Sequence, residues 1–137
     1  METKEALVQS KTLKQWVPFF AWVVLIFVGS SIPRLPGNPF GMPLWSDKVA
    51  HFLEYLILAF LFYRGIRGER WRMGFPAWLI VLATGLVIAS IDEYHQAYIP
   101  GRDSNIWDWT ADMAGVMTGA LIGMRRYRAL AGRAEKA

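Results

Sequence analysis

Ionisable side chains inside apolar segments are the residues of this 137-residue chain best suited to chemistry. They occur at three places, and each set has the spacing that puts its members on one face of a helix. Charges in apolar spans are rare and face the interior of a helix bundle, so they predict a functional site. The candidate site residues are Asp47, His51, Glu54, Tyr55, Asp92, Glu93, Gln96, Arg102, Asp108 and Asp112.

Carboxylates crowded into low-dielectric surroundings cannot all ionise at low cost. This suits them to general acid or base catalysis, or to binding a hard cation. The catalytic candidates are His51, Glu54, Asp92 and Glu93. The substrate-binding candidates are Asp47, Tyr55, Gln96, Arg102, Asp108 and Asp112. In an enzymatic version His51 or Glu93 moves a proton, and Arg102 holds an anionic head group.

No cofactor motif is evident, because the chain has no Walker loop, no G-x-S-x-G elbow and no H-E-x-x-H zinc motif. A divalent cation is the one cofactor that suits a carboxylate-rich site. In that variant Asp92, Asp108 and Asp112 share the ion with a substrate phosphate. His51 and Glu54 also share a helix face, but such a pair is more often a hydrogen bond, so the metal ligands stay unassigned.

Composition places these residues in a membrane protein. Apolar and aromatic residues make up 54% of the chain, charged residues make up only 19%, and the mean hydropathy is +0.24. These values exclude a disordered chain. They also argue against a nucleic-acid partner, since the basic residues do not gather on one soluble face. The absence of cysteine excludes thiolate catalysis and Cys-type zinc sites.

Four apolar segments are long enough to cross a bilayer, whose hydrocarbon core takes about 20 helical residues. They predict transmembrane helices at about 16–32, 47–63, 75–99 and 106–124. The expected fold is an all-α, polytopic membrane protein, a four-transmembrane-helix bundle that forms one domain over residues 1–137.

Small and turn-forming residues refine this prediction. Residues 100–105 are expected to form the turn that ends the third helix, and Ser104 is the expected cap of the fourth. The stripe of Gly115, Gly119 and Gly123 predicts close helix packing. That packing is expected within the bundle, and a homo-oligomer that packs through the same glycines is the alternative.

The distribution of Lys and Arg predicts the orientation in the cytoplasmic membrane. Twelve of the fifteen flank the segments on the side of the two termini, and the other three are Arg34, Lys48 and Arg102. Both termini are therefore expected in the cytoplasm. The acids of the last three helices then lie in the outer third of the bilayer, where we expect a shallow cavity open to the extracytoplasmic side.

Three segments resemble motifs of the VanZ-like membrane proteins. Residues 46–55 (SDKVAHFLEY) are similar to the D-K-x-x-H-F-x-x-Y signature of that family. Residues 92–102 resemble its D-E-x-x-Q…P-G-R segment, and residues 108–119 resemble its D-x-x-x-[N/D]-x-x-G-x-x-x-G helix. Asp112 stands where the pattern more often has Asn, so this position is either a neutral hydrogen-bonder or an added charge.

The resemblance covers about residues 30–123 in the same order. It implies a cell-envelope membrane protein with a link to glycopeptide (teicoplanin) resistance, for which the family is named. It brings no catalytic assignment.

Two kinds of function remain open. The first is a membrane enzyme or binder that acts on a lipid-linked or anionic envelope component. The second is a non-enzymatic structural or shielding protein whose polar residues form a fold-stabilising hydrogen-bond network. A proton- or ion-coupled transporter is disfavoured, because no acid or base continues across helices two to four.

Overall fold

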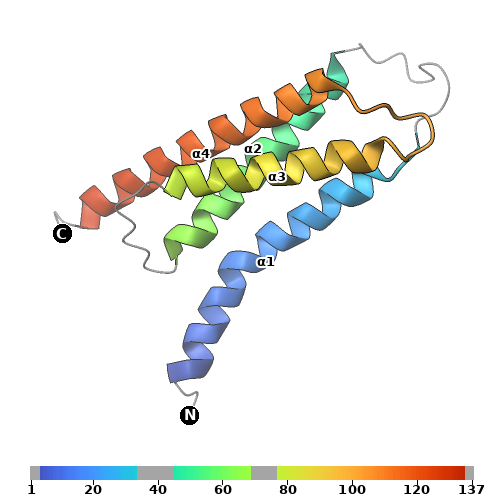
Figure 1. The fold of residues 1–137 in the computed structure, drawn as a ribbon. Helices are drawn as coiled ribbons and strands as arrows, with labels where there is room; N and C mark the ends of the chain where they lie inside the picture. Colours follow the sequence, from blue (N-terminus) through green and yellow to red (C-terminus); the bar gives the residue numbers. More distant parts are fainter. Residues whose placement is uncertain (1–3, 34–44, 69–76, 135–137) are drawn as a thin grey trace.

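The computed structural model describes residues 4–33, 45–68 and 77–134, and every regular element within these ranges is an α-helix (Figure 1). The four described helices are α1 (Lys4–Ser30), α2 (Ser46–Gly68), α3 (Ala77–Gln96) and α4 (Ile106–Ala134). The predicted all-α, four-helix fold is therefore confirmed.

Three of these helices extend beyond the predicted membrane spans. Helix α1 begins at Lys4, well before the apolar stretch that starts at Trp16, because the intervening segment is rich in the strong helix formers Lys, Leu, Gln and Ala. Helices α2 and α4 likewise continue to Gly68 and Ala134. The prediction followed hydropathy alone, whereas a helix continues past its apolar stretch for as long as its residues favour it.

Helix α3 ends at Gln96, and not at Ile99 as predicted. The amides of Tyr98 and Ile99 each bond to a carbonyl three residues back, at 3.0 Å, so the chain tightens as it leaves the helix. A type II turn follows, with a 3.0 Å bond from the Arg102 amide to the Ile99 carbonyl. Its second and third positions are Pro100 and Gly101, and Gly101 has the positive φ, 75°, that this turn requires.

The cap of α4 is Asn105, so the prediction of Ser104 was wrong by one residue. The Asn105 side-chain oxygen accepts the Trp107 amide at 3.0 Å, as an N-cap does. The Ser104 hydroxyl instead donates to Glu93 Oε2, at 3.4 Å.

Helices α2 and α4 share the most extensive contact in the bundle. A Cβ atom on Gly115 would collide with the Phe52 carbonyl oxygen, and one on Gly119 would collide with that of Leu56. The predicted close packing at these glycines is thus confirmed, and their neighbour is α2 of the same chain.

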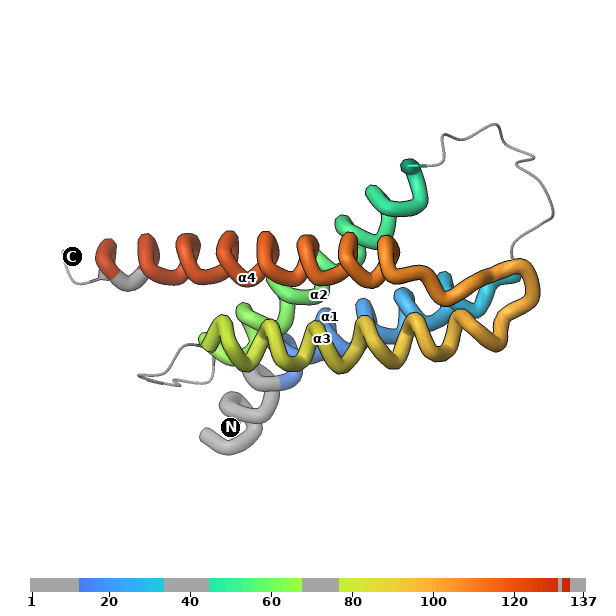
Figure 2. The backbone as a smooth tube through the Cα atoms, turned by 45° about the horizontal axis from the view of Figure 1, so that its top comes forward, coloured from blue at the N-terminus to red at the C-terminus, as the bar shows by residue number. Residues whose placement is uncertain are grey.

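The chain alternates in direction, so α1 and α3 finish where α2 and α4 begin (Figure 1). We call this the polar end of the bundle; the chain termini lie away from it. Helix α2 crosses the bundle obliquely, while α3 and α4 run alongside each other (Figure 2). Helix α1 contacts α3 near the polar end, through Ser30 and Gln96. Toward the N-terminus, α1 diverges from α3 (Figure 1).

Among the described helices, three are long and apolar enough to cross a membrane, over Leu13–Ser30, Ser46–Arg67 and Ala77–Gln96. Helix α4 is not among them, because its aspartates and glycines dilute its apolar residues. Large apolar side chains point outward from the bundle, as Phe20 and Val24 do, each 60% exposed. Such a surface belongs in lipid, and the chain is a multi-pass membrane protein.

Candidate functional site

The polar end holds a buried group of polar side chains that come from α2, α3 and α4. Each is at most 6% exposed, although these residue types are rarely buried completely. We call this group the polar cluster, and it consists of His51, Tyr55, Asp92, Glu93, Gln96, Asp108 and Asp112. The structure thus brings together seven of the ten residues that sequence spacing singled out.

A hydrogen bond between α2 and α4 lies at the centre of the polar cluster. His51 Nδ1 is 2.9 Å from Asp112 Oδ1, and both side chains are buried. The contact is close because Gly115, one turn beyond Asp112, lets the α4 backbone approach α2. The second oxygen of Asp112, Oδ2, is buried without a hydrogen-bond partner.

Glu93 links α3 to the start of α4. Its Oε2 accepts the Asn105 amide at 2.8 Å and the Ser104 hydroxyl at 3.4 Å. Its Oε1 is buried and has no partner. Glu93 therefore fixes the α3–α4 connection with one oxygen and leaves the other available.

Asp92 and Gln96 form a second connected pair, one turn apart on α3. The Gln96 amide donates to Asp92 Oδ2 at 2.9 Å, while Asp92 Oδ1 and the Tyr55 hydroxyl are buried without a partner.

Arg102 bonds to the end of α1. Its guanidinium donates to the carbonyls of Gly29, at 2.9 Å, and Ile32, at 3.1 Å, and to Gln96 Oε1, at 3.4 Å. The Gly29 carbonyl also accepts the Ile32 amide, at 3.2 Å, and Ile32 lies just beyond α1, so Arg102 connects the end of α1 to the turn after α3. Its contact with an anionic head group stays a prediction.

Lys48 contacts Asp108 of the polar cluster, although the sequence analysis did not include Lys48 among the site residues. Its ammonium forms an ion pair with Asp108 and lies 3.5 Å from Asp47. The signal was present in the sequence, since Lys48 directly follows Asp47 on the helix that carries His51. Its partner on α4 depends on how the two helices cross, which spacing along one helix does not reveal.

Two predicted positions lie at the edge of the polar cluster. Asp47 is partly exposed beside Lys48. Glu54 is also partly exposed, and its backbone carbonyl accepts the Trp22 indole N–H at 2.8 Å. His95 is not part of the cluster, and its Nε2 lies 2.9 Å from the Ser31 hydroxyl.

Two sets of side chains in the described residues have the geometry to hold a metal ion. In each set, one nitrogen or oxygen from every member lies within 4.8 Å of the others. The outer set is Asp47, His51 and Asp108, and the inner set is His51, Glu93 and Asp112. His51 belongs to both.

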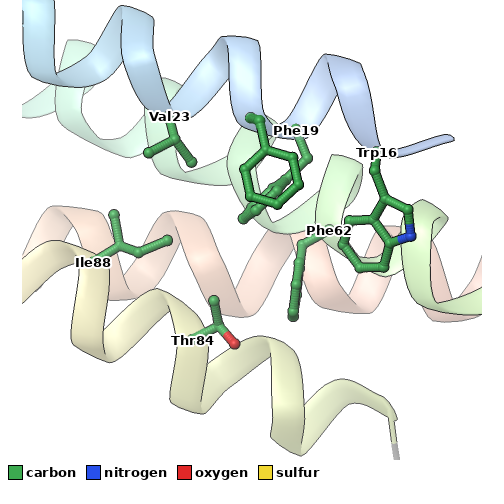
Figure 3. A pocket seen from close by; sticks show the side chains of 7 residues that line it. Trp16, Phe19, Val23, Phe62, Thr84 and Ile88 are labelled. Atoms are coloured by element: carbon green, nitrogen blue, oxygen red, sulfur yellow. The ribbon is translucent and has the colours of Figure 1, made fainter. Parts of the chain in front are cut away.

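A separate apolar groove of about 620 Å³ lies among α1, α2 and α3 (Figure 3). Its lining contains no ionisable side chain, so it is not part of the polar cluster. The lining residues are Trp16, Phe19, Phe20, Val23, Phe62, Thr84 and Ile88.

Comparison with known proteins gives one match. The family model VanZ/LLP1 matches residues 2–127, which include α1, α2, α3, most of α4 and the whole polar cluster. No curated protein and no solved structure matches the chain. Since the match covers nearly the whole length, the chain belongs to the VanZ/LLP1 family.

Proposed function

We propose that this VanZ-family protein binds or acts on a lipid-linked component of the cell envelope through its polar cluster. The observation that carries the proposal is a set of buried carboxylate oxygens without partners, on Asp92, Glu93 and Asp112. An unpartnered polar group costs about 1–3 kcal/mol. Three such oxygens at one end of a small bundle are better explained by a ligand than by folding alone.

The position of the cluster supports a substrate that is anchored in lipid. The cluster lies where α3 ends and α4 begins, while the surrounding helices present large apolar side chains outward. A ligand with an acyl or polyprenyl chain keeps its tail in the bilayer and brings its head group to this level. With both termini in the cytoplasm, as the flanking Lys and Arg favour, the cluster faces the extracytoplasmic side of the cell membrane.

The charge of the cluster limits how an anionic head group binds. Carboxylates repel a phosphate, and the guanidinium of Arg102 is already bonded to the carbonyls that end α1. A divalent cation resolves the conflict, because it attracts carboxylates and phosphate together. Resistance to teicoplanin is a finer hypothesis, and it rests on the family's association.

A structural role for the same residues is the second candidate. The hydrogen bonds of Glu93 and Gln96 connect α3 to α1 and to the α3–α4 connection. Hydrogen bonds within membrane proteins contribute only about 0.6 kcal/mol on average. The four buried polar atoms that make no hydrogen bond add nothing to such a network, so a structural role alone does not explain them.

The test compares near-isosteric variants that leave the shape of the site unchanged. Cells that lack their own copy would be complemented with wild type, Asp92→Asn, Glu93→Gln or the control Asp103→Asn, which removes an exposed acid nearby. Teicoplanin susceptibility would be measured in the cells. Binding of polyprenyl pyrophosphate would be measured with purified protein in nanodiscs.

We expect both cluster variants to lose at least about tenfold in binding, or about 1.4 kcal/mol, without a matching loss of thermal stability. The Asp103→Asn variant should match wild type. Equal melting losses in both cluster variants with unchanged binding would instead support the structural role. Lost binding with unchanged teicoplanin susceptibility would keep the binding function and remove the resistance hypothesis.

A further inference from the structure

The outer and inner sets differ in whether a lysine side chain of the protein pairs with their carboxylates. In the outer set, the Lys48 ammonium pairs with Asp108 and lies beside Asp47, so its carboxylates are neutralised by a side chain of the protein. In the inner set, no Lys or Arg among the described residues pairs with Glu93 or Asp112. Only the inner set therefore has no Lys or Arg partner among the described residues, and its one basic side chain is His51, at 2.9 Å from Asp112.

The inner set also carries two of the four unpartnered buried polar atoms. Asp112 is fully buried and Glu93 is 6% exposed, yet Asp112 Oδ2 and Glu93 Oε1 make no hydrogen bond. Two buried carboxylates that share one imidazole and have no Lys or Arg partner are costly. A divalent ion bound by both, with neutral His51, gives a site of zero net charge.

We propose that His51, Glu93 and Asp112 form a binding site for a first-row divalent transition-metal ion. One donor atom from each lies within 4.8 Å of the other two. Donors about 2.1 Å from a shared ion are separated by about 3–4 Å, and small side-chain rotations close that difference. This ligand set differs from the sequence-based one, because it includes His51 and Glu93 in place of Asp92 and Asp108.

The donor types select the class of ion. Magnesium and calcium prefer sites made only of oxygen, whereas an imidazole nitrogen favours zinc, iron or related ions. One imidazole with two carboxylates therefore fits Zn²⁺ or Mn²⁺ better than Mg²⁺. The second oxygen of Glu93 is held in place, since Glu93 Oε2 accepts the Asn105 amide. Such outer contacts fix ligands in position.

The test is metal binding by the purified full-length chain, and it does not depend on which envelope component binds. Protein stripped with EDTA would be incubated with Zn²⁺, Mn²⁺ or Mg²⁺ separately, and the retained ion measured by mass spectrometry. We expect one Zn²⁺ or Mn²⁺ per chain and little Mg²⁺. We also expect the ion to raise the melting temperature, because a ligand that binds only the folded state stabilises it.

Variants assign the ligands. Glu93→Gln and Asp112→Asn should each weaken ion binding more than about 100-fold, beyond the usual effect of an outer-shell partner. Asp108→Asn and the exposed control Asp103→Asn should retain the ion. Melting of each metal-free variant, followed by tryptophan fluorescence, identifies any variant that does not fold. If one fails, the melting shift of wild type with each ion still decides whether an ion binds.

Three outcomes would overturn the proposal. These are no retained ion and no melting shift in wild type, equal retention of Mg²⁺, or loss of the ion in Asp108→Asn but not in Glu93→Gln. The last result would move the site to the outer set. If the ion binds but polyprenyl pyrophosphate does not, the metal site stands and the proposed function fails. If the lipid binds to the stripped protein, the function stands without the metal.

Discussion

At the scale of single residues, Arg102 joins two helices that are distant in sequence. Its side chain leaves the type II turn after α3 and reaches the carbonyls at the end of α1. Pro100 and Gly101 have the backbone conformations that this turn requires. They therefore determine where the Arg102 side chain starts and which carbonyls its guanidinium reaches. Arg102 therefore stabilises the polar end of the bundle from its rim.

Removal of this side chain should destabilise the protein. We expect Arg102→Ala to lower the free energy of unfolding by about 1–2 kcal/mol, because charged donors to two carbonyls are lost. Arg102→Lys should restore only part of this, since an ammonium cannot reproduce the guanidinium fork. Thermal unfolding of purified protein, followed by tryptophan fluorescence, measures both.

The control for this prediction is Arg125→Ala. This arginine is exposed on α4, and surface substitutions of its kind usually change stability by less than about 0.5 kcal/mol. Unchanged melting in Arg102→Ala together with lost lipid binding would give Arg102 the ligand-binding role that the sequence suggested.

Residue spacing along single helices predicted most of the candidate site. A helix rotates by about 100° per residue everywhere, so Asp108 and Asp112 could be placed on one face without knowing the fold. The partners across helices could not be found in this way. The ion pair of Lys48 with Asp108, and the bonds of Arg102 to α1, depend on crossing angles and a turn that no local pattern specifies.

At the scale of helices, the packing of α4 on α2 sets the geometry of the polar cluster. Gly115 and Gly119 bring the two backbones together just beyond Asp112, at a distance that fits the 2.9 Å contact of Asp112 with His51. The glycine stripe was recognisable in the sequence because small residues mark close helix contacts. Which helix it contacts became clear only from the structure.

Enlarging one glycine should separate these helices. We expect Gly119→Ala to lower the free energy of unfolding by about 1–3 kcal/mol, as overpacking does, because its Cβ would collide with the Leu56 carbonyl oxygen. The matched control is Gly132→Ala on the same helix, where a Cβ meets nothing within 4 Å. It should leave stability unchanged or raise it, since Ala favours helix over Gly.

Size-exclusion chromatography with light scattering, run beside the melting experiment, tests the alternative use of the stripe. A dimer that becomes a monomer in Gly119→Ala, with unchanged melting, would place the glycines between two chains. A melting loss without a change in mass would support the contact with α2.

At the scale of the whole molecule, the two signs of charge separate along the bundle. Nine basic residues of the described ranges lie toward the termini or the α2–α3 connection, whereas Asp92, Asp108 and Asp112 lie at the polar end. Lys and Arg accumulate on the cytoplasmic side of membrane proteins. We therefore expect the termini in the cytoplasm and the acidic cluster on the opposite side of the membrane, where the proposed function requires an envelope component.

Orientation can be measured directly because the chain has no cysteine of its own. Single cysteines would be introduced as Asp103→Cys, in the exposed segment after the type II turn, and Gly68→Cys, at the end of α2. A membrane-impermeant maleimide added to intact cells should label Asp103→Cys, and should label Gly68→Cys only after the membrane is permeabilised. The opposite pattern would put the polar cluster on the cytoplasmic side. It would then exclude head groups found only outside the cell, while the metal site and the packing of α2 on α4 would be unaffected.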